Sequence, residues 1–175
     1  MKRFILFSLY TVILFMLQMV WREHFPLFNT GPNLVLLVIL YMAAFHEPTK
    51  GLAVAFLLGF ATDVVTGYHL GLYATIYTVV FFGMYQWGRN FYLRSIIFQL
   101  LAAVVAILSF KVLEFTMLSA FEVAWSVRWQ IWRSMPWQLL VTAAAAPIVF
   151  RPLLMIEDLA TPSLMRSGGG FSDTW

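Results

Sequence analysis

Three ionisable side chains interrupt long apolar stretches of this sequence. Asp63 stands within residues 51–66, and Lys111 and Glu114 stand within residues 95–121. A charged group among apolar residues is costly to bury, so it normally faces a cavity, a partner or an opposite charge. Lys111 and Glu114 are three residues apart and share one face of a helix, where each can neutralise the other. The pair is therefore either an internal ion pair or part of a polar pocket or partner contact.

No arrangement typical of catalysis or metal binding accompanies these residues. His24, His46 and His69 are far apart in the sequence and lack the spacing of metal ligands. Cysteine is absent, which excludes disulfides, thiolate nucleophiles and thiolate metal sites. The motifs of zinc peptidases, serine hydrolases and phosphate-binding loops do not occur. We therefore expect no enzymatic activity, no metal and no cofactor.

The composition indicates a protein that is dissolved in lipid. Hydrophobic residues make up 62% of the 175 residues and charged residues 11%, against roughly 45–50% and about 25% in soluble domains. So few charges cannot cover the surface of a soluble globule. The net charge of +3 is spread too thinly to predict nucleic-acid binding. We predict an all-α, polytopic membrane helix bundle.

About six apolar segments are candidates for transmembrane helices, two of them short. They are residues 4–21, 32–45, 51–66, 69–87, 95–121 and 135–156. The first is longer than a signal-peptide core, so we expect it to be a retained span. The second and third are either short tilted spans or a re-entrant hairpin, because Pro48 ends helix continuity between them.

The segments belong to one transmembrane helical domain, residues 1–157, which is followed by a flexible tail, residues 158–175. Glu157 and Asp158 mark the point where the chain leaves the membrane. With the N-terminus inside the cell, the inner positions carry a clear excess of basic residues: Lys2, Arg3, Lys50, Arg89, Arg94, Arg151 and Arg166, against Arg22, Arg128 and Arg133 outside. The positive-inside rule therefore predicts that both termini are cytoplasmic.

Small residues recur at four-residue spacing through the third segment and the turn after it. They are Gly51, Ala55, Gly59, Gly67 and Gly71, with Asp63 in the same series. Residues four apart share a helix face, and small residues let helices in lipid approach closely. This face either packs within the chain or docks another protein. Asp63 needs compensation from backbone amides near residues 69–71, from a lysine such as Lys111, or from water.

Tryptophan is concentrated before the last segment. Trp125, Trp129 and Trp132 have the spacing of one helix face, which predicts a short amphipathic helix in the outer interface. That helix is a membrane anchor, a lid or a contact for a periplasmic partner. The last segment contains "TAAAAP" at residues 142–147, a small-residue face with a kink at Pro147. This face either packs against neighbouring helices or docks a single-span partner.

The central part of the chain resembles the rod shape-determining protein MreD family. The resemblance rests on "PNLVLLVILYMAAF" followed by G-x7-G-x3-D-x3-G-x3-G-L-Y-A. The matching residues are Pro32, Asn33, Gly59, Asp63, Gly67, Gly71, Leu72 and Tyr73. Asn33 stands where the family often has aspartate. Chain length, the basic N-terminus and the six hydrophobic segments agree along the whole chain.

The resemblance implies a non-catalytic subunit of the cell-wall elongation complex in the bacterial inner membrane. Such a subunit would bind MreC and lie near MreB, RodA and a class B penicillin-binding protein. It also implies a fold similar to the substrate-binding subunits of energy-coupling-factor transporters, so small-molecule binding or transport is the alternative function. The sequence leaves open homo-oligomerisation and which surface binds MreC. The Gly51–Gly59 face and the final span are the first candidates.

Overall fold

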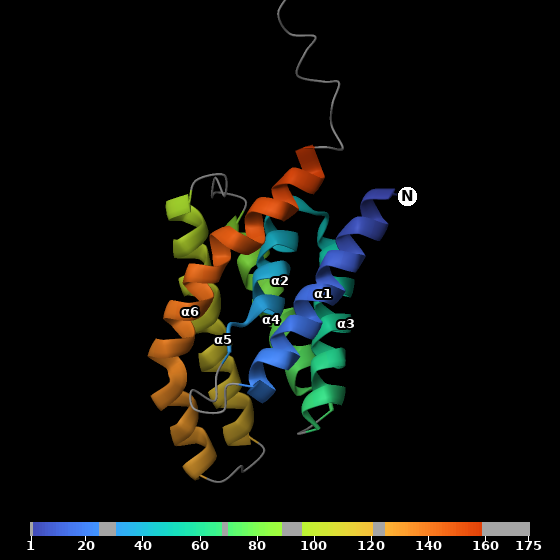
Figure 1. The fold of residues 1–175 in the computed structure, drawn as a ribbon. Coiled ribbons are helices and arrows are strands. Elements are labelled where there is room, and N and C mark those ends of the chain that lie inside the picture. Colours follow the sequence, from blue (N-terminus) through green and yellow to red (C-terminus); the bar gives the residue numbers. More distant parts are fainter. Residues whose placement is uncertain (1, 25–30, 68–69, 89–95, 121–124, 159–175) are drawn as a thin grey trace, which may run out of the picture.

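Six α-helices and no strand make up the described part of the chain (Figure 1). The computed structural model describes residues 2–24, 31–67, 70–88, 96–120 and 125–158, with side chains over 6–21, 31–67, 70–87, 96–120 and 132–155. The helices are α1 (Lys2–His24), α2 (Leu34–Phe45), α3 (Pro48–Thr66), α4 (Leu72–Gly88), α5 (Ile96–Ala120) and α6 (Trp125–Asp158).

Successive helices alternate in direction along the bundle (Figure 1). The first turn of α1 and the last turn of α6 therefore lie at the same end, which we call the terminal end. The opposite end, where α5 ends and α6 begins, is the hairpin end. Residues 159–175, which include most of the predicted tail, lie outside the described residues.

The prediction of a membrane helix bundle is confirmed. Three helical segments are long and apolar enough to cross a bilayer: Pro48–Thr66, Ile96–Ala120 and Trp132–Met155. Leu6–Trp21 and Leu34–Phe45 are shorter apolar helices.

The third predicted segment is longer than expected, because Pro48 occupies the first turn of α3, where its missing N–H costs nothing. At this turn Lys50 donates to Glu47 at 2.8 Å and lowers the pKa of the Glu47 carboxyl.

The separate amphipathic helix predicted around Trp125–Trp132 is wrong as an element. These residues form the first turns of α6, which continues without a break for 34 residues. Pro136, Pro147 and Pro152 all lie inside it. The change in hydropathy near residue 135 therefore does not coincide with a helix end, although each of the three prolines lacks the N–H of an i→i−4 hydrogen bond. The side chains of Trp125 and Trp129 lie outside the described ones.

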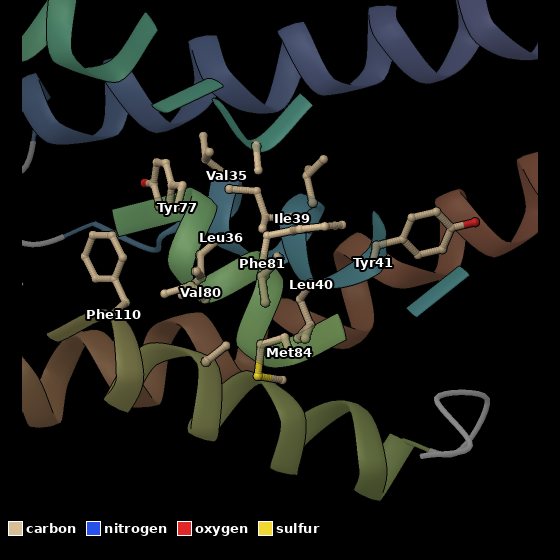
Figure 2. Packing of buried hydrophobic residues seen from close by; sticks show 14 of the residues in the cluster. Val35, Leu36, Ile39, Leu40, Tyr41, Tyr77, Val80, Phe81, Met84 and Phe110 are labelled. Carbon is tan, nitrogen blue, oxygen red and sulfur yellow. The ribbon is translucent and has the colours of Figure 1, made fainter. Parts of the chain in front are cut away.

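The short helix α2 is the centre of the bundle. Every residue from Gly31 to Ala43 is buried, and α2 contacts all five other helices. Its sequence, LVLLVILYMAAF, is apolar on every face, as a helix surrounded by protein requires. Figure 2 shows this packing, with α2 residues against α4 and Phe110 of α5: Val35, Leu36, Ile39 and Leu40 beside Tyr77, Val80, Phe81 and Met84.

The small residues of α3 pack against α4. Gly51, Ala55 and Gly59 are buried on this face, and a Cβ atom on Gly51 would collide with the Phe81 ring. A Cβ atom on Gly59 would lie 2.5 Å from the Cα of Ala74 and 2.7 Å from the carbonyl oxygen of Tyr73. At Gly59 the obstacle is backbone, which cannot rotate away. Glycine therefore lets the two helix backbones approach closely there.

We expect Gly59→Ala to destabilise the bundle by about 2–3 kcal/mol, because overpacking against backbone forces the helices apart. Gly83→Ala is the matched control, since Gly83 also lies in a helix but its added Cβ would meet nothing within 4 Å. That control should be neutral or stabilise by up to about 1 kcal/mol, the helix propensity difference. Thermal unfolding in detergent measures both. Equal midpoints for the two variants would contradict the close approach.

Candidate functional site: a buried polar network

The Asp63 carboxylate closes the N-terminus of α4. Its Oδ2 accepts hydrogen bonds from the backbone N–H groups of Gly71 at 3.0 Å and Ala74 at 3.1 Å, and its Oδ1 accepts one from Tyr73 at 2.7 Å. The residue is only 1% exposed. A helix N-terminus combines unpaired N–H donors with the positive end of the helix dipole. Asp63 supplies the matching negative group from a different helix.

Two glycines bring Asp63 to this position. Gly67 has a φ of 66° and ends α3, and its N–H donates to the Asp63 carbonyl at 2.9 Å. Gly71 has a φ of 94° just before α4 begins. Both values lie in the left-handed region that glycine adopts without a steric cost. The chain can therefore reverse and return the first N–H groups of α4 to the carboxylate one turn before the end of α3.

Lys111 and Glu114 form an ion pair inside the bundle. The Lys111 ammonium donates to Glu114 Oε2 at 2.7 Å, and the two side chains are 7% and 9% exposed. Glu114 Oε1 accepts a further hydrogen bond from the Tyr73 hydroxyl at 3.1 Å. Lys111 therefore pairs with Glu114, and the alternative partner Asp63 is occupied by backbone donors. Tyr73 joins the two groups, because its N–H binds Asp63 and its hydroxyl binds Glu114.

A second set of side chains closes the N-terminus of α2. Asn33 accepts from the Leu36 N–H at 3.1 Å through Oδ1, and the same oxygen accepts from the Tyr77 hydroxyl at 3.1 Å. Gln18 of α1 accepts from the Val35 N–H at 3.0 Å. The Asn33 N–H donates to Thr142 Oγ1 of α6 at 3.1 Å. Four helices thus meet at the point where α2 begins.

Aromatic rings lie between these two helix N-termini. Tyr73 and Tyr77 are both in contact with Phe110 of α5, with ring centroids 6.1 Å and 5.3 Å away. The Lys111 ammonium lies 5.9 Å from the same Phe110 ring centroid. Figure 2 shows Phe110 beside Tyr77. The polar groups of α2, α4 and α5 are therefore parts of one packed layer.

This arrangement is suited to holding helices together rather than to chemistry. All three donors to Asp63 are fixed backbone groups, and Glu114 accepts from Lys111 and Tyr73. Within the described residues there is no cluster of three or more potential metal ligands. The ring of His46 lies against Phe7 and Tyr41, with centroids 5.7 Å from each. The side chains of His24 and His69 lie outside the described ones.

The sequence pointed to some of these residues and missed others. Backbone amides near residues 69–71 were one of three groups expected to compensate the Asp63 carboxylate, and the structure shows that the Gly71 N–H donates to it. Gln18, Tyr77 and Thr142 were missed, because no spacing rule links residues 44 or 109 positions apart in one sequence. A polar residue in an apolar helix was the available signal for Gln18 and Thr142.

We expect Asp63→Ala to cost about 3–5 kcal/mol, because it leaves three backbone N–H groups, one buried and two partly buried, without an acceptor. Asp63→Asn should cost less, since the amide keeps one acceptor oxygen. Glu47→Gln is the control carboxylate, because the Glu47 side chain is 70% exposed in its pair with Lys50 and should change stability little. Unfolding in mixed detergent micelles measures these free energies. A small cost for Asp63→Ala would disprove the capping role.

Lys111→Ala and Glu114→Ala should each destabilise by about 3–5 kcal/mol, because each leaves one buried charge without its partner. The double substitution should cost less than the sum of the two, giving a coupling free energy above about 1 kcal/mol. A double-mutant cycle on unfolding free energies measures this coupling. Additive losses would exclude a direct interaction.

One protein-family model matches nearly the whole chain, including almost every residue discussed above. The model of the family described as rod shape-determining protein MreD matches residues 1–156. No curated protein and no solved structure matches the chain, so the expected likeness to energy-coupling-factor subunits has no support from a solved fold. The matched range contains Asp63, the Lys111–Glu114 pair and the α2 cap. On this match over nearly the whole chain, the protein belongs to the rod shape-determining protein MreD family.

Proposed function

We propose that this chain is a non-catalytic inner-membrane subunit of the bacterial cell-wall elongation complex, which binds MreC and helps to position the peptidoglycan synthase. Family membership implies a role in determining rod shape. The observation that carries the finer proposal is the internal satisfaction of the polar network. Asp63, Glu114 and Asn33 all bind groups of the same chain, which supports a rigid element that acts through its surface.

The proposed orientation has both termini in the cytoplasm. Two features support it: the excess of basic residues at the positions assigned to the inner side, and the common end of the bundle that holds the first turn of α1 and the last turn of α6 (Figure 1). With this orientation, the hairpin end faces the periplasm. It is then on the side where MreC and the synthase would act, whereas MreB would approach the terminal end.

The test is co-purification with MreC from cells that express both proteins. The tagged chain, solubilised in mild detergent, should recover MreC in a constant ratio, and Gly83→Ala should recover the same amount. Gly59→Leu, which obstructs α3–α4 packing, should lose it together with folded protein. In cells depleted of the native protein, the wild-type chain should restore rod shape.

One result would reject the proposal in favour of the alternative function. Folded wild-type chain that recovers no MreC, RodA or penicillin-binding protein, and that carries a bound small molecule in native mass spectrometry, would indicate a small-molecule binding or transport subunit. Reconstitution in nanodiscs with purified MreC then gives an independent measurement of the affinity, free of detergent effects.

A further inference from the structure

One face of α6 points away from the bundle along the whole apolar part of the helix. Arg133 and Arg151 are exposed at its two limits. Between them the exposed side chains are Trp137 at 43%, Leu140 at 63% and Ile148 at 71%, with Ala144 also exposed. This outer face, from Arg133 to Arg151, is therefore apolar in its middle and basic at both ends.

The length of helix between the two arginines is close to the thickness of a membrane. They are eighteen residues apart, which is about 27 Å along an α-helix at 1.5 Å per residue. The hydrocarbon core of a bilayer is roughly 30 Å thick. Eighteen residues at about 100° each complete five full turns of a regular α-helix, which agrees with the exposure of both arginines on the outer face.

The opposite face of α6 holds the small residues. Thr142 and Ala146 are both 0% exposed and pack into the bundle. Helices associate in lipid through small residues that allow close approach. In this helix the small-residue face is already used within the chain, and the outer face carries bulky, protruding side chains. Those side chains suit flexible acyl chains better than the surface of a second helix.

We propose that the outer face of α6 binds phospholipid in both leaflets, with Arg133 and Arg151 each holding a headgroup phosphate. The planar guanidinium group donates two parallel hydrogen bonds to a phosphate, which a point charge cannot do. Trp132 and Trp137 are exposed beside Arg133, at the depth where indole rings prefer to lie. The two phosphate contacts then fix the depth of the whole bundle in the bilayer.

This depth places the polar network at defined levels. Thr142 is nine residues from each arginine, so it lies at the bilayer midplane. Asn33 donates to Thr142 at 3.1 Å, and α2 therefore begins at the midplane. Trp125 lies eight residues before Arg133, about 12 Å beyond the hydrocarbon. Figure 1 agrees, since the first turns of α6 extend beyond the ends of α1, α3 and α4 at the hairpin end.

The first experiment asks what covers this face. The chain has no cysteine, so single nitroxide labels can be introduced at Leu140, Ala144 and Ile148 in the full chain, in membranes that also contain MreC. Lipid contact predicts high oxygen and low nickel-chelate accessibility at all three, as at Leu57 of α3, which is 63% exposed. Low accessibility to both reagents at all three positions would mean that a protein helix covers the face, and would overturn the proposal.

The second experiment tests the arginines. Full-length chain from nanodiscs of phosphatidylethanolamine and phosphatidylglycerol is released in native mass spectrometry, and retained lipids are counted. Arg133→Gln and Arg151→Gln should each lose about one retained phospholipid, and the double variant about two. Lys50→Gln, which removes an exposed cation that pairs with Glu47, should retain the wild-type number. Equal retention by the double variant and the wild type would refute the phosphate contacts. This lipid count uses the chain without MreC, so its result is independent of MreC binding.

Discussion

The position of one carboxylate determines much of this bundle. Asp63 ends the small-residue face of α3 and binds the first N–H groups of α4, so the two helices must cross where both backbones are close. Because the two backbones are so close, a side chain at Gly59 would collide with the backbone of α4. It also fixes Tyr73, whose hydroxyl reaches Glu114 and thereby links α4 to α5. In lipid no water can replace these donors and acceptors, so each must be met by protein.

The need to satisfy every buried backbone group within the protein also explains how a helix can begin inside the bundle. The first turn of α2 is buried in the bundle, where Asn33, Gln18 and Thr142 bind the groups around it. Residues 31–33 are non-helical but buried, and irregular backbone is tolerated at membrane depth when protein surrounds it. A short apolar helix thereby becomes the core around which five others pack.

Much of the architecture follows from local rules, and the rest depends on contacts between distant positions. Hydropathy located six helices, and the polar residues around Pro48 located the turn between the second and third. The four-residue spacing of Gly51, Ala55 and Gly59 indicated a packing face. Hydropathy could not show whether α2 is a short span or a helix at the centre of the bundle, because its residues would be apolar in either case. The hydropathy pattern also started the last segment too late, at residue 135, because the sequence is already more polar over residues 125–134, where α6 is still helical. The bond between Asn33 and Thr142 has no signal in one sequence.

The buried position of α2 has a consequence for biogenesis. Its 12 residues cover about 18 Å, too little to span a bilayer alone. The acceptor for the Asn33 N–H is Thr142, 109 positions later. While α3 to α5 are being synthesised, this segment lacks the α6 residues that pack against it in the finished bundle. Completion of the native core therefore awaits synthesis of α6, so the last helix to leave the translocon determines when the second one reaches its final place.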